Sequence, residues 1–421
     1  MDRKKGPMIH GLNKMPLPEV ENVELQNGTK YIECSLGVQE IVKIDILFRA
    51  GRIVEDKPLA SRATANLLRN DTQLKSAKVV EEILDFYGTS IKVASGMDYS
   101  YISFVTLNKF FEPVSDVVEE MIKLPKFSEK ELNKFKKNSI AKLKIELSKN
   151  DVVAYREHTS LIFGESHPYG YNSTAEGIQK LELSDITQHY SNYYTSRNCM
   201  IFVTGKVTDS IRHSIHQKFG AIENKSLHQN KIKQPIRNAI GTYHFESKNK
   251  LQAALRIGCP LFPRYHQDNA GFYMLNTLLG GYFGSRLMKK IREEDGYTYG
   301  IYSSMDQMVD EGYFYVSCEL APENVDIVSQ AIFDEMNLLK NDLVGRQELE
   351  MVKNYVMGSI LNLLDGPFNI GSYYKMLYSN GLDKGFYDSF VDAVKSTDSR
   401  LLRDLAIKYF DENKMTQVNV Q

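Results

Sequence analysis

One stretch of the sequence, residues 278–304, contains side chains able to bind a peptide backbone. Arg292 carries a planar guanidinium with five N–H donors, and Tyr299 carries one hydroxyl group. Both groups can donate hydrogen bonds to peptide carbonyl oxygens without reading side chains. The structural alternatives are an ion pair from Arg292 to Glu293 or Asp295, and core packing for Tyr299.

The same stretch predicts the local elements that hold these two residues. It begins as a glycine-rich loop, and a short amphipathic helix follows, because Leu287, Met288 and Ile291 recur at helical spacing. Gly296 is placed to end that helix, since glycine tolerates left-handed backbone dihedrals. A tyrosine-rich strand is expected at 297–303. The sequence therefore predicts that Arg292 closes a helix and that Tyr299 lies on the following strand.

The rest of the chain alternates predicted helices and strands. Ser128 and Glu131 form a capping-box pattern at the start of a long helix. In the first half we expect strands at 30–34, 42–48, 90–94, 99–107 and 198–205. We expect helices at 58–70, 76–87, 112–123, 128–149, 152–163 and 184–194.

The second half repeats this order of elements, which indicates a duplication. The triplet at 334–336 matches 119–121, the start of the helix at 347 matches 130, and the final strand at 415–420 matches the strand near 200. The sequence therefore predicts an α+β fold of two similar domains, 1–218 and 236–421, joined by a polar linker at 219–235. Such a linker predicts that the two domains hinge freely.

Composition excludes several classes of protein. The chain has 421 residues with 52 Lys and Arg against 53 Asp and Glu, so charge does not favour nucleic acid or a membrane as partner. No run approaches the ~18 apolar residues of a membrane span, and the N-terminus has no secretory pattern. The four cysteines are isolated in sequence, which favours reduced thiols in a cytoplasmic protein.

From about residue 23 to the end, the sequence resembles the M16 family of zinc peptidases, the insulinase and mitochondrial-processing-peptidase group. The resemblance rests on the loop, helix and strand around Arg292 and Tyr299, and on the duplication. It implies two α/β sandwich domains of the fold shared by LuxS and the processing peptidases. It also implies that Arg292 and Tyr299 hold the substrate backbone.

The resemblance fails where the family carries its metal. Family members have an H-x-x-E-H motif on the first helix, in which two histidines bind Zn²⁺ and the glutamate is the general base. The matching positions here are Arg62, Ala65 and Asn66, and residues 50–90 contain no histidine. The third ligand would come from the helix at 128–149, where the candidates are 141–144 and the nearest acidic residue is Glu146. We therefore expect no metal and no catalytic residue in this chain.

Other histidines do not replace the lost motif. His213 and His216 are spaced i, i+3 but have no acidic or thiol neighbour in sequence, so two surface histidines are expected. His158 and His167 flank a turn containing Pro and Gly, whose chemistry explains that stretch. Glu157 beside His158 has no nearby nucleophile, so it does not indicate acid–base catalysis.

The sequence thus predicts a non-catalytic M16 homologue. It would form a heterodimer with a zinc-containing M16 subunit, with Arg292 and Tyr299 contributing peptide contacts to the partner's active site. A homodimer remains open, as does a stand-alone peptide-binding or scaffold protein of the processing-peptidase or respiratory core-subunit type. An independent enzyme with other chemistry is a further alternative, although we do not expect catalysis from this chain alone.

Overall fold

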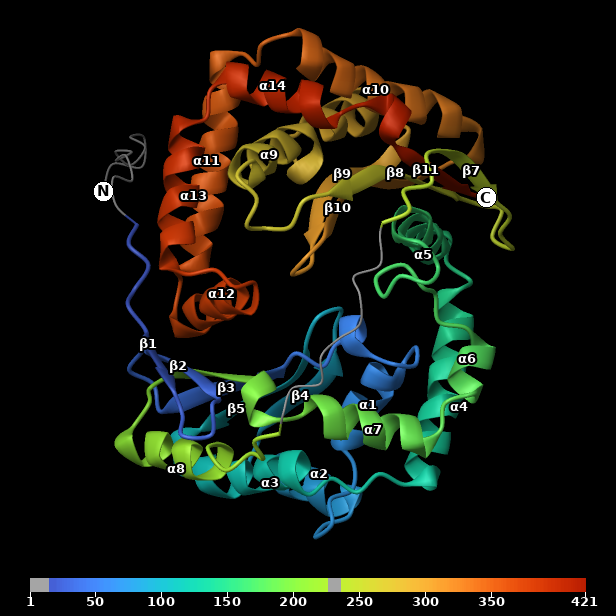
Figure 1. Cartoon of the computed structure of the whole chain (residues 1–421). Helices are drawn as coiled ribbons and strands as arrows, with labels where there is room; N and C mark the ends of the chain where they lie inside the picture. The colour runs from blue at the N-terminus through green and yellow to red at the C-terminus, as the bar shows by residue number, and fades with distance from the viewer. Residues whose placement is uncertain (1–14, 226–235) are drawn as a thin grey trace.

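A computed structural model describes residues 15–225 and 236–421. Within these residues the strands form two sheets, one from each half of the chain (Figure 1). The predicted α+β class is confirmed. Residues 226–235, most of the expected linker, lie outside the described residues, so the domain boundaries stay a prediction.

The first sheet is six-stranded, in the order β1-β2-β6-β3-β5-β4. β2 and β6 are parallel, and the other neighbours are antiparallel. The strands are β1 (Glu21–Glu24), β2 (Lys30–Ser35), β3 (Ile41–Phe48), β4 (Ser90–Ser95), β5 (Ser100–Leu107) and β6 (Cys199–Gly205).

The second sheet repeats the first without a counterpart of β1. Its order is β7-β11-β8-β10-β9, again with one parallel pair, β7 and β11. The matching order and directions agree with the duplication predicted from the sequence. The strands are β7 (Gly241–Phe245), β8 (Ala253–Leu261), β9 (Thr298–Gln307), β10 (Gly312–Leu320) and β11 (Thr416–Val420).

Helices surround both sheets. The predicted cap of α4 is present, because the Ser128 hydroxyl accepts a hydrogen bond from the Glu131 N–H. Among the described residues, no helix is both long and apolar enough to cross a bilayer. The α-helices of the first half are α1 (Ala60–Leu68), α2 (Ala77–Phe86), α3 (Phe111–Lys123), α4 (Glu129–Glu146), α5 (Asn150–Phe163), α6 (Ala175–Gln179), α7 (Leu183–Tyr193) and α8 (Asp209–Phe219). Those of the second half are α9 (Asn269–Asn276), α10 (Val325–Asn341), α11 (Arg346–Leu363), α12 (Pro367–Ser379), α13 (Lys384–Ser396) and α14 (Ser399–Tyr409).

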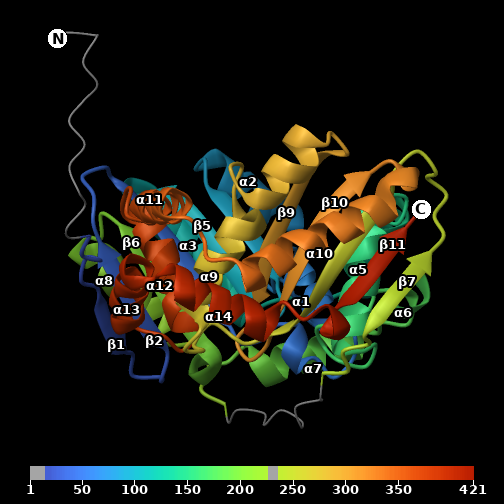
Figure 2. The same ribbon diagram turned by 90° about the horizontal axis from the view of Figure 1, so that it is seen from above.

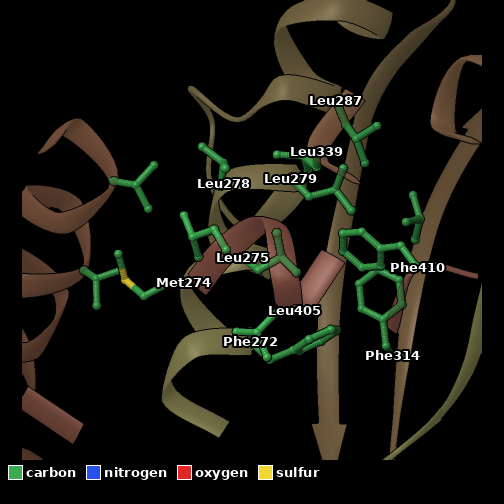
Figure 3. Close-up of a cluster of buried hydrophobic side chains, with 14 of the residues drawn as sticks. Phe272, Met274, Leu275, Leu278, Leu279, Leu287, Phe314, Leu339, Leu405 and Phe410 are labelled. Carbon is green, nitrogen blue, oxygen red and sulfur yellow. The ribbon is translucent and has the colours of Figure 1, made fainter. Parts of the chain in front are cut away.

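The core of the second half forms between its sheet and the helices α9, α10 and α14. Phe272 of α9 packs edge-on against Phe314 of β10 with ring centroids 5.6 Å apart, and Phe410 lies against both rings (Figure 3). Leu275 and Leu405 are buried in the same cluster. This apolar packing fixes α9, which leads directly into the stretch that carries Arg292 and Tyr299.

One helix from each half of the chain packs on the sheet of the other half. α5 packs on β8 and β11 of the second sheet, and α12 packs on β6 and β2 of the first (Figures 1 and 2). Ala154 of α5 is fully buried in a cluster with Ala254, Val418 and Val420 of the second sheet. The predicted hinge stays a prediction, and a motion that separated these contacts would expose apolar surface.

A buried ion pair joins the halves at the second of these contacts. The carboxylate of Asp45, on β3, is 2% exposed and lies 2.9 Å from Lys375 Nζ of α12. Lys43 Nζ lies 3.2 Å from the same carboxylate. Because a carboxylate removed from water needs charged partners, Lys375 of α12 helps to stabilise the buried Asp45 at this contact.

Candidate functional site

The helix at the lost metal motif, α1, exposes Arg62 and Asn66 one turn apart on its outer face. Ala65 is 1% exposed and belongs to the face that packs into the protein. The sequence spacing therefore placed two of the three motif positions on one exposed face. Both of these side chains line a cavity of about 630 Å³.

The start of α1 is held in an unusual backbone conformation. Leu59 has φ of 75°, a left-handed value that is rare for a residue with a branched side chain. Its N–H donates to the Tyr171 hydroxyl at 3.1 Å, and Glu55 accepts from the Ser61 N–H and hydroxyl at 3.1 and 2.9 Å. Burial raises the pKa of the Glu55 carboxyl. Strain of this kind persists where surrounding contacts enforce it, and it fixes the direction of α1.

The cavity beside Arg62 is lined from α1, α4 and the edge strand β4, and by Glu81 of α2. β4 is paired only with β5, so its other backbone edge faces the cavity at 93–95. From α4 the lining side chains are Glu131, Lys134, Phe135, Asn138, Ser139 and Lys142. Among the sequence candidates 141–144, only Lys142 lines the cavity, and Glu146 does not.

Most charges in this cavity are already paired. Arg69 binds Glu81 through Nε and Nη2 at 3.1 and 3.2 Å. Glu131 accepts from Asn70 at 3.2 Å and lies 3.5 Å from Lys134. By contrast, Arg62 makes no hydrogen bond or ion pair within the described residues. Its guanidinium is thus the free cation of this cavity.

The cavity residues do not fit zinc. Zinc sites in proteins use Cys, His and carboxylate ligands, whereas the lining side chains of α1 and α4 include one carboxylate, Glu131, which Asn70 and Lys134 already engage. Across residues 15–225 and 236–421, no three His, Cys, Asp or Glu side chains are grouped so as to hold a metal ion. A fixed guanidinium also repels a divalent cation.

The remaining histidine candidates lie in structural positions. His213 and His216 are exposed on α8, and His216 contacts the Tyr31 ring edge-on at 4.9 Å. His158 and His167 are buried, and His167 Nδ1 accepts from the Tyr169 N–H at 3.0 Å within the predicted turn. These positions are consistent with the structural roles expected from the sequence.

Arg292 and Tyr299 are adjacent in space. Arg292 lies in a π-helical segment, η5 (Met288–Glu294), and its Nε donates to the Tyr299 carbonyl oxygen at 2.9 Å. Its guanidinium also stacks over the Phe283 ring, 4.9 Å from the centroid. Nη1 lies 3.8 Å from Glu293, one of the alternative partners considered. The contact between Arg292 and Tyr299 uses the Tyr299 backbone, so the Tyr299 hydroxyl is not engaged by it.

A β-bulge explains why Tyr299 points outward. Cys318 of β10 pairs with Ile301, but Leu320 pairs with Thr298, so Tyr299 and Gly300 together oppose Glu319. Such an extra residue re-aims the side chains around it. Tyr299 is consequently 95% exposed, which excludes the core-packing alternative for it. It lines a second cavity, of about 820 Å³, that runs along β9.

The glycine-rich loop before Arg292 permits a close backbone contact with β9. A Cβ atom on Gly280 would lie 2.6 Å from the Ser303 backbone nitrogen, so no larger residue fits there. Gly296 has φ of 70°, in agreement with its predicted role at the end of the helix. These two glycines therefore place η5 directly against β9.

Arg62 and Asn66 line the cavity at α1 in the first half, whereas Tyr299 lines the cavity along β9 in the second half, and Arg292 lines neither cavity. The edge-strand hairpins β4–β5 and β9–β10 nevertheless meet at their turns. There Asp98 accepts a hydrogen bond from the Val309 N–H at 3.1 Å, and Arg49 binds Asp310 at 3.2 Å. Sequence reasoning missed both open edges and this junction, because strand pairing is not encoded in local periodicity.

Comparisons with known proteins agree with this geometry. The family model described as "Peptidase M16 inactive domain" matches residues 180–356. The "uncharacterized zinc protease YmxG" of Bacillus subtilis strain 168 is 25% identical over 350 residues, 82% of this chain and 85% of that protein. The "non-peptidase homolog YmxG" of Helicobacter pylori is 22% identical over 89% of this chain and 87% of its own length. The crystal structure of a peptidase M16 inactive domain from Pseudomonas fluorescens has the same fold, with a TM-score of 0.87, 22% identity, and coverage of 96% of this chain and 98% of that one.

Proposed function

This chain is a homologue of the M16 peptidases, and we propose that it binds extended peptides without cleaving them. We further propose that it serves a separate, zinc-containing M16 subunit as the substrate-binding partner. The observation that carries the proposal is the bulge that presents Tyr299 beside a fixed Arg292 on an open strand edge.

Peptide binding is supported by the position of β9 at the edge of its sheet. In its sheet β9 is paired only with β10, so its outer edge can accept an added strand. Main-chain hydrogen bonds of this kind bind a peptide through its backbone, which suits extended segments of varied sequence. The Tyr299 carbonyl oxygen holds Arg292 through Nε, and Nη1 lies 3.8 Å from Glu293, so Nη2 is the nitrogen available to a peptide carbonyl.

We infer the need for a partner from the side chains at the metal-motif positions of α1. Peptide hydrolysis by this family's chemistry requires a metal-bound water and a general base. Arg62, Ala65 and Asn66 offer neither, and Lys142 lines the same cavity from α4. A second chain would therefore supply the metal, while this one supplies contacts to the peptide.

Fluorescence anisotropy with a labelled, unstructured peptide tests the binding role. Arg292→Ala should weaken peptide binding by about tenfold or more, since a hydrogen bond to a charged group contributes about 1.5–3 kcal/mol. Tyr299→Phe removes only the hydroxyl and should weaken binding less. The matched controls are Arg400→Ala and Tyr265→Phe, which alter exposed residues away from β9 and should leave the Kd unchanged.

Reconstitution tests the partner role. Size-exclusion chromatography should show a complex with a zinc-containing M16 chain, and Arg292→Ala should lower the peptidase activity of that complex without loss of folding. If the protein binds peptides but neither forms this complex nor changes the activity, a stand-alone peptide-binding or scaffold role replaces the subunit role. Intact peptide binding and turnover in Arg292→Ala would show that β9 is not the site.

The cellular location is also part of this proposal. All four cysteines are unpaired and buried, which supports a reducing compartment such as the cytoplasm. Fractionation of cells that express the protein would test it directly, and recovery from the periplasm or medium would contradict it.

A further inference from the structure

A third cavity, of about 460 Å³, is lined by residues of α9, α11, α12 and α13 in the second half. Figure 1 shows where these four helices lie. The cavity shares no lining residue with the cavities at α1 or β9. Its volume falls within the range of about 300–1,000 Å³ that is typical of small-molecule sites. Any function of this cavity is therefore independent of the peptide-binding role proposed above.

Aromatic and aliphatic side chains make up most of its wall. Tyr273 of α9 meets Phe390 of α13 edge-on, with ring centroids 5.5 Å apart, and Phe386 stacks beside Phe390 at 6.3 Å. Val356 and Ile360 of α11 are almost fully buried at the same place. Such a wall favours a ligand whose body is apolar.

The amide groups in this wall are largely engaged by the protein. Asn269 accepts from the Gln307 side chain at 2.9 Å. Asn369 donates to the Asn362 and Asp365 carbonyl oxygens at 3.1 and 2.9 Å. These groups therefore do not define the polar part of a ligand.

Arg264 is the exception. It lies just before α9 and lines both this cavity and the neighbouring one between the two halves. Its Nε is buried without a hydrogen-bond partner, and no ion pair to Arg264 exists among the described residues. Burial lowers the pKa of its guanidinium, although this group keeps its charge at neutral pH. Arg264 is partly buried, so its guanidinium has lost part of its hydration, and a bound carboxylate would offset that loss.

We propose that this cavity binds an organic carboxylate with an apolar body, and that its carboxylate pairs with Arg264. A planar guanidinium can bind a carboxylate through two parallel hydrogen bonds, which gives the site its polarity and orientation. The apolar body then lies among Tyr273, Phe386 and Phe390. The carboxylate belongs either to a free acid or to the C-terminus of a peptide that ends in an apolar residue.

The absence of tryptophan from the 421-residue sequence allows a direct measurement. Phe390→Trp places a single fluorescent reporter in the wall of the cavity. Titration of the full chain with decanoate should change its emission and saturate. Decanol, which has the same chain without the charge, should bind at least about tenfold more weakly, because it lacks the ionic hydrogen bonds.

Variants at Arg264 identify the charge that is responsible. In the Phe390→Trp background, Arg264→Met should weaken decanoate binding at least about tenfold and leave decanol binding unchanged, which also shows that the cavity is intact. Arg264→Lys keeps the charge and should retain part of the affinity, which covers the case that Arg264→Met does not fold.

Peptides distinguish the two sources of the carboxylate. A short peptide ending in Phe and its C-terminal amide are titrated alongside decanoate. Binding of the acid-form peptide but not the amide assigns a peptide C-terminus, whereas binding of decanoate alone assigns a free acid. Failure of both carboxylates to bind overturns the proposal. Equal binding of each charged compound and its neutral counterpart overturns it as well.

Discussion

Gly371→Ala tests whether the close approach of α12 to the first sheet stabilises the protein. Gly371 lies in α12 against Thr204 of β6. A Cβ atom on Gly371 would lie 2.7 Å from Thr204 Cγ2 and 3.0 Å from Thr204 Cβ. Rotation about χ1 of Thr204 exchanges its methyl and hydroxyl groups but leaves Cβ in place. Rotation therefore cannot relieve the contact, and α12 or β6 has to shift.

The expected effect is the difference of two opposing terms. Adding a methyl group to a filled interface costs about 1–3 kcal/mol. Alanine in place of glycine inside a helix recovers about 1 kcal/mol of helix propensity. The free energy of unfolding should consequently fall by up to about 2 kcal/mol. Urea-induced unfolding followed by circular dichroism measures it.

Gly358→Ala is the matched control. Gly358 lies inside α11, and a Cβ atom there would meet nothing within 4 Å, so this variant should gain up to about 1 kcal/mol. Thr204→Ala removes the methyl and hydroxyl groups that face Gly371. Adding it to Gly371→Ala should give a stability above the sum of the two single effects. The reasoning is refuted if Gly371→Ala is as stable as Gly358→Ala, or if the two changes are simply additive.

Four further predictions follow from buried or engaged groups. Lys375→Met should lower the free energy of unfolding by about 2–3 kcal/mol in urea titrations, because Asp45 is buried and loses one of its two cations. Burial lowers the pKa of His158 to about 3, so the unfolded chain takes up a proton near pH 6.5 that the native chain does not. Unfolding free energy should thus fall as pH drops from about 6.5 toward 3, and His158→Gln should flatten that dependence; an unchanged slope would contradict it. Burial raises the pKa of all four thiols, so the native protein should react slowly with a thiol reagent at pH 8 and release four equivalents only in denaturant. The triple variant Arg62→His, Asn66→His, Lys142→Glu places three zinc ligands in the α1 cavity. Zinc analysis after dialysis should find about one equivalent in this variant. It should find none in the unaltered chain or in the double variant that lacks Lys142→Glu.

Several features of the fold were predictable because they depend on local sequence. The strand expected at 42–48 is observed at Ile41–Phe48, and the long helix begins at its predicted Ser128 cap. Alternating and helical periodicities record which face of an element is buried, and caps record where a helix begins. The duplication was also visible, since each half repeats the same order of these local patterns.

The candidate site was predictable in part. The spacing of Arg292 and Tyr299 placed them on adjacent elements, but not the contact between guanidinium and backbone carbonyl. The outward direction of Tyr299 depends on the bulge, which exists only in the pairing of β9 with β10. Four candidates for the third motif position were open from the sequence, and of these only Lys142 lines the cavity beside α1.

The sequence by itself determined which zinc ligands are missing from the motif positions of α1. Arg62 and Asn66 cannot bind zinc in any fold, because the ligand chemistry resides in the side chains themselves. Only the tertiary structure decided that α5 and α12 cover each other's sheets, since an amphipathic helix carries no record of which sheet it will cover. Tertiary packing likewise left Arg264 in an apolar cavity without an anion, because whether a charge is paired depends on residues distant in the chain.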